Sequence, residues 1–119
     1  MPEPQAIDRA VFDALVQSVQ GDRAFVQELI DTYLEDAPKL IADIRAAVNA
    51  DQADVLRRAA HSLKSNSASF GAMTLSALCK ELEAMGKDGV LDGAAGRLER
   101  LAGEYEQARD ALRLLRDES

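Results

Sequence analysis

The chain of 119 residues carries 14 Lys and Arg against 21 Asp and Glu, a formal net charge of −7. It lacks the broad basic surface that displaces counterions from nucleic-acid phosphates, so we expect no nucleic-acid partner. Its length suits a single domain over residues 1–119, and an Ala-, Leu- and Glu-rich composition with only three prolines favours an all-α fold.

The sequence indicates neither membrane insertion nor secretion. No apolar run approaches the roughly 20 residues that are needed to cross a bilayer. The single cysteine, Cys79, cannot form an internal disulfide, and no secretory signal peptide is recognisable at the start of the chain. We therefore expect a cytoplasmic protein without a membrane association of its own.

Five amphipathic stretches follow a polar leader of residues 1–7 and predict five helices. The predicted helices span residues 8–20, 22–49, 51–70, 73–87 and 90–117. Asp8, Asp22 and Asp51 are the expected capping residues of the first three, and Gly71 is expected to end the third in a left-handed conformation. Pro38 lies inside the second, where we expect a kink or a brief break.

Short turns between the predicted helices make neighbours antiparallel. We therefore expect an up-down-up-down four-helix bundle, with the short first helix covering one end. The last helix has the longest periodic stripe, from Leu91 to Leu115 in steps of three and four. Such a stripe also fits a dimeric coiled coil, but three preceding amphipathic helices favour an intramolecular bundle, and we expect a monomer.

His61, the only histidine, lies on the polar face of the third predicted helix. The apolar stripe of that helix includes Leu56, Leu63 and Phe70, so His61 points to solvent. Arg57 and Arg58 precede His61 by one turn and Lys64 follows it by one turn, where positive charge would stabilise an anion on the ring. A solvated helix face with a histidine and basic residues is common, so the spacing alone is also compatible with an ordinary protein surface that has no function.

The residues around His61 are small. Ser62, Ser65, Ala68 and Ser69 follow it on or beside the same face of the helix. A partner that carries a phosphoryl group could approach the imidazole without steric obstruction. The arrangement favours an exposed nucleophile that reacts with a group carried by another protein.

The residues from His61 to Ala72 read His-Ser-Leu-Lys-Ser-Asn-Ser-Ala-Ser-Phe-Gly-Ala. This segment resembles the signature of histidine-containing phosphotransfer (HPt) domains, in which His-x-Leu-Lys-Gly precedes small residues and an apolar-Gly pair. The likeness extends to the acidic helix that ends near residues 35–38, to the lead-in at residues 51–60 and to the segment at residues 78–83.

The resemblance implies a carrier that relays phosphoryl groups between receiver-domain aspartates and His61 in a two-component phosphorelay. Receiver domains of response regulators and a hybrid histidine kinase would be its partners. The receiver would supply Mg²⁺, so the chain needs no cofactor, and without a nucleotide-binding loop we expect no kinase or ATPase activity. Lys64, Arg57, Arg58 and Ser65 are the expected phosphate-stabilising residues. The possible partner contacts are Ser62, Ala68, Ser69, Glu83, Lys87, Val11 and Leu15.

Two residues depart from the family pattern. Ser65 stands where the family usually has glycine, and its hydroxyl could either bond the phosphoryl oxygens or slow the partner's approach. Glu83 matches a position of the following helix that is often glutamine and lies near the imidazole. A carboxylate there would repel an incoming phosphoryl group, although Glu83 also fits an ordinary surface residue.

Other functions remain open at this point. Asp31, Glu35, Asp36 and Asp43 share the solvent side of the second helix, but no histidine is nearby and we expect no metal site. A helical adaptor that binds a receiver without taking phosphate is one alternative. A drain that returns phosphate to a receiver for hydrolysis is another, because the direction of flow depends on the partners.

Overall fold

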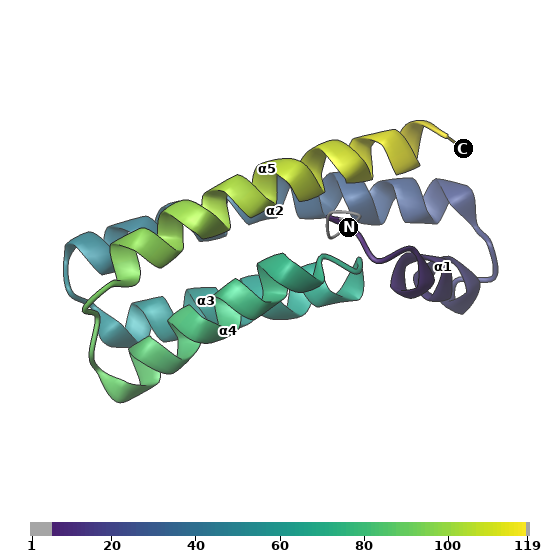
Figure 1. Cartoon of the computed structure of the whole chain (residues 1–119). Helices are drawn as coiled ribbons and strands as arrows, with labels where there is room; N and C mark the ends of the chain where they lie inside the picture. Colours follow the sequence, from purple (N-terminus) through teal and green to yellow (C-terminus); the bar gives the residue numbers. More distant parts are fainter. Residues whose placement is uncertain (1–5, 119) are drawn as a thin grey trace, which may run out of the picture.

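The computed structural model describes residues 6–118, which form five α-helices and, within that range, no strand. They are α1 (Arg9–Ser18), α2 (Arg23–Asn49), α3 (Ala53–Ser69), α4 (Met73–Asp88) and α5 (Ala94–Asp117). Of the predicted leader, residues 1–5 lie outside the described residues. In Figure 1, α2 and α5 lie side by side in one layer and α3 and α4 in the other, with α1 at one end. The predicted four-helix bundle with an added short helix is confirmed.

One apolar stripe from each long helix builds the core. Its largest fully buried aliphatic side chains are Ile30 and Ile44 of α2, Leu56 and Leu63 of α3, Leu75 and Leu82 of α4, and Leu101 and Leu112 of α5. Each such side chain contributes about 1.5–3 kcal/mol when it leaves water, so the stripes fix how each helix is turned about its axis. The polar face of α3 consequently faces solvent.

Asp8 and Asp22 are capping residues, as predicted. The Asp8 carboxylate accepts a hydrogen bond of 3.0 Å from the backbone N–H of Ala10, and the Asp22 carboxylate accepts one of 3.1 Å from that of Phe25. Both bonds satisfy N–H groups that have no partner within the helix. The chain therefore enters α1 and α2 at the residues that the sequence indicated.

The prediction that Asp51 caps the third helix is wrong. Asp51 has a left-handed backbone with φ of +55°, and Gln52 takes the N-cap position without a side-chain bond. The N–H of Gln52 donates to the carbonyl of Ala47 at 2.8 Å, a bond that closes the end of α2. Asp tolerates the left-handed region better than most residues, so Asp51 ends α2 instead of starting α3.

Of the kink or brief break expected near Pro38, the break does not occur, because α2 is continuous from Arg23 to Asn49. Pro38 lies on the exposed side of the helix, next to the buried Ala37. The carbonyl group that loses its intrahelical donor can bond to water on that side. Core contacts on either side of the proline keep both halves in one helix.

The last helix begins later than predicted, at Ala94 instead of residue 90. The N–H of Ala94 donates to the carbonyl of Leu91 at 3.0 Å, and Gly93 has φ of +84°. These features form a turn from Leu91 to Ala94. The apolar periodicity of the sequence includes Leu91 but cannot show that its backbone belongs to the turn.

Candidate functional site

His61 lies in the middle of α3 with its side chain 61% exposed, as its place on the polar face predicted. Its neighbour Ala60 and the next core residue, Leu63, are fully buried. The backbone at His61 is therefore anchored on the core side while the imidazole faces solvent. A macromolecular partner can reach the ring without rearrangement of the bundle.

A carboxylate from α4 joins two of the predicted site residues of α3. Glu83 Oε2 lies in hydrogen-bond contact with His61 Nδ1, and Glu83 Oε1 accepts a bond of 2.6 Å from Lys64 Nζ. The Glu83 and Lys64 side chains are 21% and 26% exposed. The nearest charged group to the imidazole is thus an anion. Helical spacing indicated only cations around the ring, whereas the family resemblance had placed Glu83 near it.

The contact with Glu83 distinguishes the two ring nitrogens. An ionised carboxylate only accepts, so Nδ1 carries the proton and donates it toward Glu83. In the neutral ring Nε2 then has the free lone pair and faces away from Glu83. The hydrogen bond from Lys64 is the largest cause of a lowered pKa at the Glu83 carboxyl; partial burial raises that pKa and the bond from His61 lowers it again.

A shallow basic hollow surrounds this cluster. Its lining residues are Arg57, His61 and Lys64 of α3 and Lys80, Glu83, Ala84 and Lys87 of α4. Four cations therefore face one carboxylate. Arg58, which the sequence placed near the ring, does not line the hollow, and its Nε donates to the carbonyl of Asp54 at 3.4 Å.

Sequence reasoning missed Lys80. A signal was present, because Lys80, Glu83, Ala84 and Lys87 recur at spacings of three and four and so share one stripe of α4. That stripe carries charged residues at the edge that faces the polar side of α3. Pairing it with the stripe of His61 required the relative rotation of the two helices.

The close crossing of α3 and α4 depends on Gly86. A Cβ at this position would lie 2.7 Å from the carbonyl oxygen of Ala53 and 2.8 Å from the backbone nitrogen of Arg57. Gly86 follows Glu83 by one turn of α4, and Arg57 precedes His61 by one turn of α3. The crossing therefore sets the short separation across which Glu83 reaches His61.

We expect Gly86→Ala to lower the free energy of unfolding by about 1–2 kcal/mol. Overpacking against backbone costs about 1–3 kcal/mol, and the better helix propensity of alanine offsets up to about 1 kcal/mol of that cost. Gly96→Ala is the matched control, since a Cβ there meets nothing within 4 Å, and should stabilise by about 0.5–1 kcal/mol. Urea unfolding measures both, and equal stabilisation by the two substitutions would contradict the close crossing.

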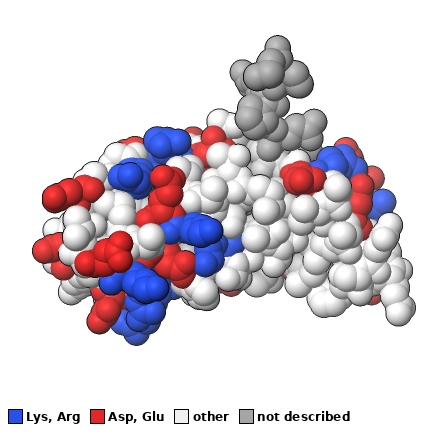
Figure 2. Space-filling model, turned by 60° about the horizontal axis from the view of Figure 1, so that its bottom comes forward, with Lys and Arg blue, Asp and Glu red and all other residues white. Residues whose placement is uncertain are grey.

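The other side of His61 is nearly free of charge. Figure 2 views the face formed by α3 and α4: charged side chains gather toward the end where α3 begins, whereas the surface toward α1 is largely uncharged. Ser62, Ser65 and Ser69 are exposed there and Ala68 is half-buried. The Ser69 hydroxyl donates to the carbonyl of Ser65 at 3.1 Å.

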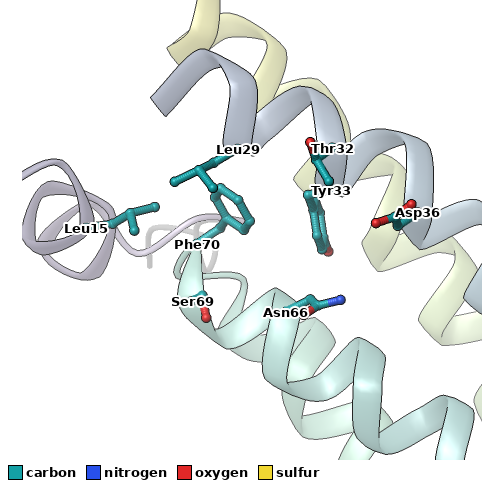
Figure 3. A pocket seen from close by; sticks show the side chains of 8 residues that line it. All are labelled: Leu15, Leu29, Thr32, Tyr33, Asp36, Asn66, Ser69 and Phe70. Carbon is teal, nitrogen blue, oxygen red and sulfur yellow. The ribbon is translucent and has the colours of Figure 1, made fainter. Parts of the chain in front are cut away.

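A hollow between α1, α2 and α3 adjoins this side, and among the described residues that line it Asp36 is the one charged residue (Figure 3). Its lining residues are Leu15 of α1, Leu29, Thr32, Tyr33 and Asp36 of α2, and Asn66, Ser69 and Phe70 of α3. Leu15 thus borders an open hollow. Val11, the other residue of the first helix that was predicted to contact a partner, lies against Gly71 and is half-buried.

Two further observations concern metal binding and membrane insertion. Among residues 6–118, no three His, Cys, Asp or Glu side chains converge as metal ligands would. In the same range, no helix is both long enough and apolar enough to cross a bilayer.

The family model of the Hpt domain matches residues 28–111, a range that includes His61, Lys64 and Glu83. The chain belongs to the Hpt domain family. This Hpt domain is also similar to the crystal structure of histidine-containing phosphotransfer protein B (HptB) from Pseudomonas aeruginosa PAO1, with a TM-score of 0.88, 30% identity and 99% of each chain covered.

A curated relative of this Hpt domain is Multistep phosphorelay regulator 1 of Schizosaccharomyces pombe. The two are 31% identical over an alignment of 94 residues, which covers 75% of this chain and 32% of the relative. The chain thus spans about a third of the length of that protein.

Proposed function

We propose that this protein relays phosphoryl groups between receiver-domain aspartates and His61 in a two-component phosphorelay. One observation carries the proposal: on an Hpt fold, the exposed His61 has its Nδ1 bonded to Glu83, which leaves Nε2 as the nucleophile. The fold family and the names of the two relatives support this choice.

In the proposed step, Nε2 of His61 attacks the phosphorus of a receiver aspartyl phosphate. The phosphorus–oxygen bond to the aspartate breaks, the phosphorus–Nε2 bond forms, and the aspartate leaves as a carboxylate. Positive charge develops on the ring while Nδ1 keeps its proton, and the Glu83 carboxylate that accepts from Nδ1 stabilises this charge. The receiver supplies Mg²⁺, so this chain contributes the nucleophile and its electrostatic surroundings.

The cations of the basic hollow are the proposed phosphate-stabilising groups. Lys64 and Arg57 line the hollow together with His61, and Lys80 joins them as a candidate. Arg58 is proposed only as a partner contact, because its side chain lies outside the hollow. Ser65, one turn after His61, is the remaining candidate and lies where the partner must approach.

We propose that the receiver docks over His61 and the uncharged surface toward α1. The candidate contacts in α3 are Ser62, next to His61, and Ala68 and Ser69 further along the helix. Leu15 and Ser69 border the hollow of Figure 3. Glu83 and Lys87 lie on the opposite side, in the basic hollow. Further proposals are a hybrid histidine kinase as upstream partner, a monomeric state, a cytoplasmic location and no kinase or ATPase activity in this chain.

We expect Ser65→Gly to transfer phosphoryl groups at least as fast as the wild type. The serine side chain is exposed beside the approach to His61, and its removal leaves more room for the partner. The substitution should also lower the free energy of unfolding by about 0.5 kcal/mol, because glycine is the poorer helix former. Rapid-quench transfer and urea unfolding measure the two effects, and a large slowing of transfer would assign the hydroxyl a direct role.

The test of the function uses a radiolabelled phospho-receiver with Mg²⁺. Label should move to this protein and then to a second, unlabelled receiver. A receiver that binds the protein without transferring label to it would favour the adaptor. Label that returns only to the first receiver and is released there as inorganic phosphate would favour the drain.

A further inference from the structure

Lys64 has two possible anionic partners that lie on different sides of the imidazole. Its Nζ lies 2.6 Å from Glu83 Oε1, while the second oxygen of the same carboxylate contacts His61 Nδ1. A phosphoryl group on Nε2 projects from the opposite side of the ring. To hold that group closely, the Lys64 ammonium has to leave Glu83.

We propose that Glu83 is a positioning residue that competes with the phosphoryl group for Lys64 and so lowers the stability of phospho-His61. The inference rests on the proposed function. In the unphosphorylated protein, Glu83 has both Lys64 and His61 as partners. When Lys64 turns to the phosphoryl group, the partly buried carboxylate keeps only the bond from Nδ1.

Glu83 also stabilises the positive charge of the phosphorylated ring through Nδ1, and in this proposal two effects together outweigh that stabilisation. The unphosphorylated protein gains the Lys64–Glu83 pair, whose side chains are 26% and 21% exposed and therefore only partly screened by solvent. The phosphorylated protein places a dianion near the Glu83 carboxylate, and like charges repel. Glu83 thus favours release of the phosphoryl group to a receiver over its retention.

Glu83→Gln tests this competition. The glutamine carbonyl oxygen can still accept from Nδ1, but the amide NH₂ group at its other end cannot accept from Lys64. Lys64 is then available to the phosphoryl group. We expect the equilibrium constant for transfer from a phospho-receiver to His61 to rise by about three- to fivefold. This increase of about three- to fivefold corresponds to the free energy of one partly screened ion pair.

A partner-free measurement separates this effect from docking. Phosphoramidate donates its phosphoryl group to Nε2 with loss of ammonia, and the isolated phosphoprotein then loses it to water as inorganic phosphate. We expect the half-life of Glu83→Gln phospho-His61 to exceed that of the wild type. In a Lys64→Met background, Glu83→Gln should change the half-life and the equilibrium constant by less than about twofold.

Glu81→Gln is the matched control, because Glu81 is on the same helix but pairs with Arg97 of α5. It should leave both quantities unchanged. A lower equilibrium constant in Glu83→Gln, or the same increase with and without Lys64, would overturn the competition. Phosphorylation of the wild type in the same experiment would still uphold the proposed function. Failure of both donors to phosphorylate the wild type would overturn the two proposals together.

Discussion

His61→Gln should reduce phosphoryl uptake by more than about a thousandfold, because it removes the only imidazole in the chain. Glutamine is similar in size and polar, but its amide nitrogen has no free lone pair for in-line attack. The sequence contains no second histidine that could replace it. Uptake of label from a phospho-receiver measures the loss.

The fold of this variant should be intact. The His61 side chain is 61% exposed, and substitutions at such positions change stability by about 0.5 kcal/mol or less. Glu83 keeps its bond from Lys64. A helical circular dichroism signal and a urea midpoint equal to those of the wild type would therefore attribute the loss to chemistry. Normal uptake by folded His61→Gln would place the phosphoryl group on another residue.

Gly71→Ala should lower the free energy of unfolding by about 2–5 kcal/mol. Gly71 has φ of +88°, which costs a non-glycine residue about 1–2 kcal/mol. An added Cβ would also lie 2.6 Å from the carbonyl oxygen of Asp8, and overpacking costs about 1–3 kcal/mol. The Asp8 N–H donates to the Gly71 carbonyl at 2.8 Å, so the strain acts where α1 joins the bundle.

Gly89→Ala separates the two costs. Gly89 has φ of +73°, but a Cβ there would meet nothing within 4 Å. It should therefore show only the conformational part, about 1–2 kcal/mol. If urea unfolding gave the two variants equal losses, the close approach of Gly71 to Asp8 would contribute nothing. Proton exchange at the amides of α1 should increase in Gly71→Ala, since α1 packs mainly against α3.

Much of the fold could be predicted because the helix patterns are strong and local. Asp8 and Asp22 cap helices in the ordinary way, and the left-handed Gly71 ends α3 as expected. The errors arise where the chain departs from local rules. Asp51 resembles a capping residue in the sequence but adopts a left-handed conformation that ends α2. Of the kink or break expected at Pro38, the break does not occur, because core packing keeps the helix continuous.

The candidate site was predictable only in part. The place of His61 on α3 follows from helical periodicity, and its exposure agrees with that pattern. The family resemblance placed Glu83 near the imidazole, but its bridge to both His61 and Lys64 does not follow from the sequence. The bridge depends on how α4 is rotated against α3 and on the close crossing at Gly86. Arg58 and Lys80 show the same limit, since only the packed helices decide which cations line the hollow.

The central claim concerns one atom, Nε2 of His61. Nuclear magnetic resonance of ¹⁵N-histidine-labelled protein, phosphorylated by phosphoramidate, can identify the nitrogen that is bonded to phosphorus. We expect one phosphoryl group per chain, bonded to Nε2, with the proton retained on Nδ1 toward Glu83. A phosphoryl group on Nδ1, or on any residue other than His61, would contradict the account.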